Sequence, residues 1–510
     1  MPRLPSYSYV CVALAFLSNF ANAGPANLPG HTTPLGVVVG TAVLDGVQYL
    51  NKGLVGFGMI PSTMKDSSGD SLGGFGSALF LKRGTFKETR DGKFSGTFLA
   101  RPDRGYNVDV TVDYQARQHE IDFVFSPYTG SANLSFSDAQ KMLQLKYRKT
   151  TYMYDRHHRK TSGLDPTYVR NAQVGSKGNP LRDPDVPVVS KSDQRLVLDV
   201  EGLVANKDGS FWISDEYGPY IYRFSASGDL IQTIQPPNAV LPRDASGSLN
   251  FTSMSNPKTG RSPNQGFENL AFDEANGILY AMLQSATIQD GGDSKTTSRY
   301  TRLFAYDVSR PTKSVRLVGE WVVPLPQNNK NGKTYGASEM LFVSPGVFLV
   351  LSRDGDGKGS DDLSSKYKKA DLFSISKATD IHNTKYDDPA HPIAVGGILN
   401  SDIRPAEYVL FVDYLDPIQL AKFGLHNGGK NDATLIASKW ESLALAPVNE
   451  RAYPNDHYLF TAADNDFMSR QGVSLGKPYD AGVDVDNQVF VFRVTLPSVK
   501  KGSVERFIGI

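Results

Sequence analysis

The stretch EGLVANKDGSFWISDEYGP, residues 201–219, decides the fold because it encodes two short strands joined by a tight turn. An apolar run at 203–205 leads into a Lys-Asp-Gly turn, and a run with aromatic and β-branched residues follows at 211–213. This order is typical of a β-hairpin. In an antiparallel pair, the start of the first strand and the end of the second lie at the same edge. Glu201, Asp215 and Glu216 are therefore expected to lie together.

The same order of residues recurs along the chain. In each repeat a glutamate precedes an apolar run, a turn follows, and a second strand-like run comes after it; these repeats begin at Glu268, Glu339 and Glu441. The second runs of the last two repeats end beside Arg353, Asp354 and Asp464. A weaker copy at 75–105 has no glutamate before its first run, and it contains Arg104 near its end. One edge of the predicted sheets therefore collects the charged residues.

The glutamates at 201, 268, 339 and 441 are spaced by 67, 71 and 102 residues, which is too long for a helical solenoid. Such spacing suits a four-stranded propeller blade with insertions. Blades pack around an axis, so equivalent residues converge at one end of the central channel. We predict an all-β fold, a β-propeller of about five to seven blades with long inserted loops, in which the four glutamates share one channel mouth.

Two other stretches have a distinct character. Residues 137–147 favour a short helix, because Asp138 lies in its first turn and Met142, Leu143 and Leu145 form an apolar face. Residues 150–195 are polar and rich in Pro, Gly and Lys, so we expect a long excursion from the sheets.

The first residues have the pattern of a secretory signal. Arg3 precedes an apolar run, and Ala21-Asn22-Ala23 matches a cleavage site, so we expect a signal peptide at 1–23 and one mature domain at 24–510. No run approaches the ~20 apolar residues of a membrane span. Cys11 is the only cysteine, so the mature domain would have no disulfide. We expect a secreted monomer.

The net charge and the glycosylation triplets limit the class of ligand that the protein is expected to bind. Loss of Arg3 from the 54 basic residues leaves them equal in number to the 53 acidic ones, which argues against nucleic acid as a ligand. Asn133 and Asn250 begin glycosylation triplets for a eukaryotic secretory route. These features favour a small-molecule ligand outside the cell.

Several short motifs match catalytic or metal-binding motifs, but they lack the neighbouring strands or ligand residues that the chemistry requires. Two GxSxG matches, at 69–73 and 472–476, follow no strand. The Asp354 loop opens like a calcium loop, but Lys358 and Ser365 stand where oxygen ligands would be needed. The eight histidines show no paired zinc spacing. A hard cation bound by carboxylates is the favoured metal.

Glutamates that meet at one mouth cannot all be ionised without a countercharge, because like charges raise one another's pKa. A Ca²⁺ ion, or Arg104 and Arg353, would supply that charge. The expected metal ligands are Glu201, Glu268, Glu339, Glu441 and Asp464.

The repeats also carry a family resemblance. The blocks LDVEGLV, WISDEYGPYIYRF, NQGFENLAF, SEMLFV, VLSRDGDG, WESLALAP and AADNDF together resemble the phytase-like family, described as having esterase-like activity of phytase, over roughly residues 70–495. This resemblance implies a secreted β-propeller assigned to phosphoester hydrolysis.

These expectations combine into a metal-dependent phosphoric-ester hydrolase. Carboxylates would hold Ca²⁺, the arginines would offset the phosphate, and a carboxylate would take the proton of the attacking water. The expected catalytic residues are Arg104, Glu216, Arg353 and Asp354. Hydrolysis of a lactone or carboxylic ester on the same scaffold is an alternative. A secreted binding propeller, whose acidic ring recognises a cationic or sugar ligand, is another.

Overall fold

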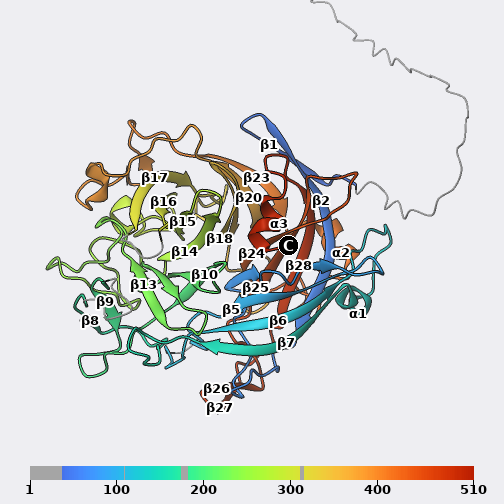
Figure 1. The fold of residues 1–510 in the computed structure, drawn as a ribbon, viewed down its shortest axis with the longest axis horizontal. Helices are drawn as coiled ribbons and strands as arrows, with labels where there is room; N and C mark the ends of the chain where they lie inside the picture. The colour runs from blue at the N-terminus through green and yellow to red at the C-terminus, as the bar shows by residue number, and fades with distance from the viewer. Residues whose placement is uncertain (1–36, 108–109, 174–181, 311–314) are drawn as a thin grey trace, which may run out of the picture. The chain divides into compact units, whose positions relative to one another are not determined.

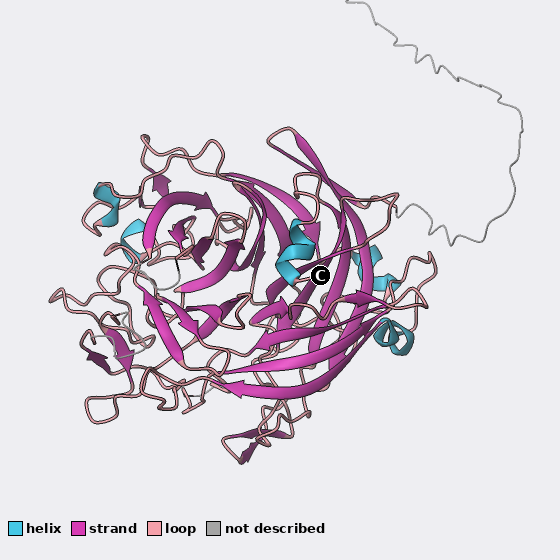
Figure 2. Ribbon diagram, in the orientation of Figure 1, coloured by secondary structure: helices cyan, strands magenta, loops and turns pink. Residues whose placement is uncertain are grey.

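The computed structural model describes residues 37–107, 110–173, 182–310 and 315–510, and strands dominate these segments (Figure 2). The α-helices within them are short: α1 (Phe136–Ala139), α2 (Pro417–Lys422) and α3 (Ser503–Ile508). Single 3₁₀ turns lie at Gln140–Met142, Ile288–Asp290 and Lys385–Asp387. The predicted signal peptide at 1–23 lies outside the described residues. The prediction of an all-β fold is confirmed.

Five antiparallel sheets form the blades of a propeller (Figure 1). Blade 1 contains β3 (Ala78–Leu81), β5 (Phe94–Arg101), β6 (Arg117–Phe125) and β7 (Leu143–Tyr152), with β4 (Lys87–Glu88) paired to β5. Blade 2 contains β10 (Val200–Ala205), β11 (Phe211–Asp215), β12 (Ile221–Phe224) and β13 (Leu230–Ile234). Blade 3 contains β14 (Phe267–Asp273), β15 (Ile278–Leu283), β16 (Tyr300–Asp307) and β17 (Arg316–Pro324).

Blade 4 contains β18 (Gly336–Ser344), β19 (Val347–Arg353), β20 (Lys368–Ser374) and β23 (Glu407–Asp413). Blade 5 contains β24 (Lys439–Pro447), β25 (Asp456–Asp464), β28 (Asn487–Thr495), β2 (Val47–Ile60) and β1 (Gly40–Leu44), in that order. Three small hairpins leave the blades: β8–β9 (Tyr168–Arg170, Val186–Val188), β21–β22 (Ala394–Val395, Ile398–Leu399) and β26–β27 (Gly472–Ser474, Lys477–Tyr479).

The innermost strands form a closed ring. Strand β3 contacts β10, β10 contacts β14, β14 contacts β18, β18 contacts β24, and β24 contacts β3. Blade 5 closes this ring with strands from both ends of the described chain, because β2 pairs with β28 and places Phe57 opposite Phe490. The five blades fall within the predicted range of about five to seven.

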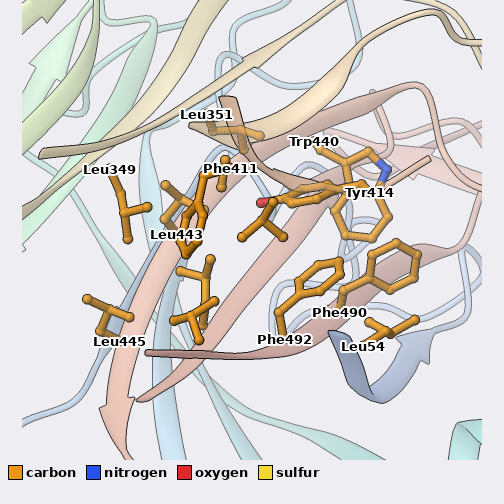
Figure 3. Packing of buried hydrophobic residues seen from close by; sticks show 14 of the residues in the cluster. Leu54, Leu349, Leu351, Phe411, Tyr414, Trp440, Leu443, Leu445, Phe490 and Phe492 are labelled. Atoms are coloured by element: carbon orange, nitrogen blue, oxygen red, sulfur yellow. The ribbon is translucent and has the colours of Figure 1, made fainter. Parts of the chain in front are cut away.

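Apolar and aromatic side chains pack between blade 4 and blade 5 (Figure 3). The rings of Trp440 and Phe490 are stacked with their centroids 4.1 Å apart. Tyr414 packs against both of these rings and stacks on Phe492. Because Trp440 belongs to β24 while Phe490 and Phe492 belong to β28, this cluster ties the inner strand of blade 5 to the strand that pairs with β2.

The helix predicted at 137–147 is wrong from Leu143 to Tyr147. The helix α1 and a 3₁₀ turn end at Met142, and β7 begins at Leu143. In the first half of β7 the residues alternate between more buried and more exposed, which is the period of a strand and not of a helix. Pairing with β6, which places Tyr147 opposite Ile121, overrides the local helical pattern. The excursion at 150–195, in its described part, contains the end of β7 and the two short strands β8 and β9.

Candidate functional site

A β-bulge at the start of the inner strands aims glutamates at one end of the channel, called here the upper mouth. In β14 the register shifts between Phe267 and Asn269, so Glu268 is the extra residue. The same shift surrounds Glu441 in β24 and Glu201 in β10. A bulge re-aims a side chain locally. Burial, followed by the charges of neighbours that include Glu268 and Glu441, accordingly raises the pKa of Glu201. Burial, followed by the charges of Glu216 and Glu441, raises the pKa of Glu268.

The structure differs from the expected register at Glu339. The bulge of β18 lies between Ala337 and Glu339, so Ser338 holds the position that glutamate holds in the other strands. Oε1 of Glu339 instead accepts hydrogen bonds from the N–H groups of Met340 and Leu270, at 2.7 and 3.2 Å. A displacement of one residue points a strand side chain elsewhere. Three of the four glutamates are therefore brought together, and Glu339 is not.

The second strands of the blades deliver the remaining charged groups to the same mouth. Asp215 lies opposite Val200, Arg353 opposite Gly336, and Asp464 opposite Lys439. In blade 3, Gln284 follows β15 and donates a hydrogen bond to Oε1 of Glu268. Strand starts and strand ends thus share one edge, as the hairpin pattern predicts.

Three buried carboxylates converge at the blade 2 side of the mouth. Carboxylate oxygens of Asp199, Glu201 and Glu216 lie within 4.8 Å of one another. Oδ1 of Asp199, Oε2 of Glu201 and Oε1 of Glu216 are buried without a hydrogen-bond partner among the described residues. Burial, followed by the charge of Asp199, raises the pKa of Glu216 to about 8. Buried oxygens without partners are costly, and three oxygen donors fit a hard cation such as Ca²⁺.

A second carboxylate group is already balanced by a cation of the protein. Oxygens of Asp103, Asp464 and Asp466 lie within 4.8 Å of one another. Nζ of Lys439 lies 3.3 Å from Asp464 and 2.7 Å from Asp466. Asp464, expected as a metal ligand, belongs to this group and is separate from the Glu201 group. The ammonium of Lys439 supplies a positive charge that an ion would otherwise bring.

Both predicted arginines lie against mouth carboxylates. Nη1 of Arg104 is 3.2 Å from Oδ2 of Asp199 and donates to the hydroxyl of Tyr217 at 3.1 Å. Nη2 of Arg353 donates to Oε1 of Glu441, while Nε of Arg353 is buried without a partner among the described residues. Each arginine therefore offsets part of the negative charge at the mouth.

Asp354 is engaged by its own loop. Its carboxylate accepts hydrogen bonds from Oγ of Ser365 at 2.6 Å, from the N–H of Lys366 at 2.5 Å and from Nζ of Lys368 at 3.0 Å. Burial pushes its pKa up, but the charge of Lys368 and these hydrogen bonds hold the pKa below its usual value. Asp354 is therefore a weaker proton acceptor than the mouth glutamates.

A polar cleft of about 1440 Å³ borders the mouth. Its lining includes Gln284, Ser338 and Arg353, which connect it to the bulge residues, together with basic side chains on two loops of blade 3 and blade 4. Lys295, Lys330 and Lys333 are among these side chains, and all three are exposed. The cleft offers a small anionic molecule a route to Arg353.

Comparisons with known proteins identify the family of this chain. A family model described as "Phytase-like: Esterase-like activity of phytase" matches residues 89–467. The chain belongs to the phytase-like family. An uncharacterized secreted protein of Arthroderma benhamiae is 35% identical over 498 residues, which cover 91% of this chain and 96% of that protein. The phytase-like assignment and the secretion predicted from the sequence are thereby confirmed.

Two solved structures are similar at low identity. The N-terminal domain of Nup159 is 10% identical with a TM-score of 0.29, covering 86% of the phytase-like chain and 96% of that domain. A putative 6-phosphogluconolactonase of Bacteroides uniformis is 12% identical with a TM-score of 0.26, covering 80% and 85% of the two chains. Among the described residues, no helix has the length and apolar character needed to cross a membrane.

Two charged residues of the upper mouth, Asp199 and Lys439, were not predicted as site residues, although the sequence repeats contain a signal for them. Asp199 and Lys439 each stand two residues before a bulge glutamate, so they occupy equivalent positions with opposite charges. Gly266 holds that position in blade 3, where a Cβ would come within 2.5 Å of the carbonyl oxygen of Glu216. A comparison of this position between the repeats would have indicated its role.

The cation-free protein is expected to lose stability as pH rises. The folded protein keeps the Glu216 proton up to a pKa of about 8, whereas the ordinary value is 4.5. A raised pKa contributes stability that is complete below the ordinary value and is lost as pH rises through the folded value. We expect a loss on the order of 2–4 kcal/mol between pH 4.5 and 8.

Urea unfolding of chelator-treated protein at several pH values measures this loss. Glu216→Gln should reduce the pH dependence, since an amide does not titrate, and saturating Ca²⁺ should also reduce it by keeping the carboxylates ionised. A profile of the wild type that is already flat without Ca²⁺ would contradict the burial argument.

Proposed function

We propose that this phytase-like protein is a secreted hydrolase of phosphoric esters that uses a divalent cation, Ca²⁺, held by Asp199, Glu201 and Glu216. The observation that carries the proposal is the convergence of these three buried carboxylates, each with an oxygen that has no partner among the described residues. The family description, which refers to an esterase-like activity of phytase, supports the same reaction class.

Oxygen ligands alone favour a hard cation. Neither carboxylate group found in the described part of the chain contains histidine or cysteine, the ligands that zinc prefers. Ca²⁺ takes carboxylate oxygens in flexible geometry, which suits residues drawn from a strand, a bulge and a loop. When bound, such an ion polarises a phosphoryl oxygen and lowers the pKa of water.

The arginines are placed to receive the phosphate. The guanidinium groups of Arg104 and Arg353 can each donate two parallel hydrogen bonds to phosphate oxygens. Arg353 lines the cleft, and its side chain is 12% exposed. The buried Nε of Arg353 has no partner within the described residues, so a donor remains for an anion.

Glu268 is the best proton acceptor for the attacking water. Its Oε2 is buried without a partner among the described residues, while Gln284 fixes Oε1. Burial raises its pKa, and Arg353 and Lys439 oppose that rise. In the proposed step the water oxygen forms a bond to phosphorus, the ester P–O bond breaks, Glu268 takes the water proton, and the leaving alkoxide takes a proton from solvent to leave as the alcohol. This assigns Glu216 to the cation and Glu268 to the proton, the reverse of the roles expected from the sequence.

A hydrolysis screen with and without chelator tests the proposal. Purified protein loaded with Ca²⁺ should release phosphate from phosphomonoesters or inositol phosphates, and the rate should fall at least ~100-fold after chelation and return with Ca²⁺. Turnover of lactones alone would move the activity to carboxylic-ester chemistry. Calcium binding without turnover of any of these substrates would favour a binding propeller and overturn the proposal.

Arg353→Ala is expected to raise KM for a phosphate ester about tenfold or more, since it removes a charge-assisted hydrogen bond worth ~1.5–3 kcal/mol. Calcium affinity should stay nearly unchanged, because Arg353 contacts Glu441 and not the Asp199 group. Steady-state kinetics and calcium titration check the two effects, with Arg353→Lys as the matched variant that keeps the charge. A parallel loss of calcium affinity would contradict the separation of roles.

A further inference from the structure

The lower half of the central channel encloses a cavity at the end opposite the carboxylates. It has a volume of about 480 Å³ and is lined by the later residues of all five inner strands, β3, β10, β14, β18 and β24. Helix α3, which contacts β24, forms part of its wall. Sites for small molecules commonly have volumes in this range.

Apolar side chains dominate the cavity wall. Phe272, Leu341, Phe342 and Phe507 line the cavity and are only partly buried. Burial of apolar surface stabilises a protein by about 25 cal/mol for each Å² removed from water. Large apolar side chains that stay accessible in a cavity do not gain this stabilisation. An apolar molecule in the cavity would cover this surface.

Two buried carboxyl groups, Asp273 and Glu339, interrupt the apolar lining. Both oxygens of Asp273 already accept hydrogen bonds, from the N–H of Ala275 and from Nδ2 of Asn276. Glu339 lines the cavity and is 2% exposed. Its Oε1 accepts from two backbone N–H groups, and the structure shows no hydrogen bond to its Oε2 within the described residues. A hydroxyl group can donate to a carboxylate and can also accept from a protonated carboxyl. A hydroxyl therefore fits Glu339 in either protonation state.

The wall formed by α3 is anchored. Nη2 of Arg83 donates to the carbonyl of Arg506 at 2.7 Å, and the N–H of Gly84 donates to the carbonyl of Ile508 at 2.7 Å. The ring of Phe507 meets the edge of Phe80 with centroids 5.2 Å apart. These contacts hold the helix to blade 1, so the cavity has a fixed shape on that side.

We propose that this cavity binds a small apolar molecule with one hydroxyl group, an aliphatic or aromatic alcohol, whose hydroxyl meets Oε2 of Glu339 while its carbon skeleton covers Phe272, Leu341 and Phe342. The site is separate from the carboxylate mouth and does not depend on the proposed hydrolysis.

Calorimetric titration of the full chain with 1-hexanol and with 1-methoxypentane tests the proposal. The two probes have equal numbers of non-hydrogen atoms, but only the alcohol carries a hydroxyl. The alcohol should bind about tenfold more tightly than the ether and, at ten times its Kd, raise Tm by about 2 °C. Absence of binding by the alcohol, or equal binding of both probes, would overturn the proposal.

Three variants test whether the two probes bind in this cavity. Leu341→Trp should fill the cavity and abolish binding of both probes, whereas Glu339→Met should keep binding and remove the tenfold preference for the alcohol. Ile418→Trp, at an exposed position of α2, is the control and should bind both probes like the wild type. Binding that survives Leu341→Trp, or a preference that survives Glu339→Met, would place the probes elsewhere and overturn the proposal. Circular dichroism confirms that each variant is folded.

Discussion

Glu201→Gln is expected to lower calcium affinity by at least about 100-fold, or ~3 kcal/mol, and to abolish hydrolysis of a phosphate ester. The substitution keeps the shape of the side chain but removes the negative charge between Asp199 and Glu216. A neutral amide offers one oxygen and no countercharge to a divalent ion. Calorimetric titration with Ca²⁺ measures the affinity, and phosphate release measures the rate.

Glu339→Gln is the matched control for this experiment. The sequence repeats place Glu339 in the same series as Glu201, but the structure aims it into the lower channel. Its amide oxygen would still accept from the N–H groups of Leu270 and Met340. We expect calcium affinity and hydrolysis within about twofold of the wild type, a difference of ~0.4 kcal/mol. Equal losses in the two variants would contradict the assignment of the mouth.

Phe490→Ala is expected to lower the free energy of unfolding by about 3–5 kcal/mol. Phe490 is fully buried, stacks on Trp440 and lies opposite Phe57 of β2. Truncation leaves a cavity where the inner strand of blade 5 meets the strand that pairs with the start of the described chain. Because this blade closes the ring, the whole fold should share the loss.

Urea unfolding followed by tryptophan fluorescence checks this value. Leu410→Ala is the control, because Leu410 lies on β23 with 54% of its surface exposed, and its loss should stay within ~0.5 kcal/mol. A loss below ~1 kcal/mol for Phe490→Ala would contradict the role of blade 5 as the closure of the ring.

The local hairpin patterns predict much of this fold. The two-strand unit at 201–219 forms β10 and β11, and the weaker copy at 75–105 forms β3 and β5 although no glutamate precedes its first run. The membership of blade 5 was not predictable in this way, because β2 pairs with β28 across more than 400 residues. Such pairing depends on closure of the ring and leaves no local signal.

The candidate site was predictable at the level of chemistry and only partly at the level of residues. Apolar runs indicate which strands begin near a glutamate, but they do not show which residue the bulge makes extra. That choice separates Glu339 from Glu268, although both precede similar apolar runs. Asp199 was not predicted because it lies before the hairpin. In the structure its backbone N–H donates a hydrogen bond to Oδ2 of Asp215, which places Asp199 at the mouth.

An anomalous difference map from crystals grown with Ca²⁺ tests the calcium site directly. We predict a strong peak within about 2.3–2.6 Å of oxygens of Asp199, Glu201 and Glu216, and the loss of that peak in crystals of Glu201→Gln. A calcium peak among Asp103, Asp464 and Asp466 instead, or no peak at the upper mouth at saturating Ca²⁺, would contradict the claim that these three carboxylates hold the ion.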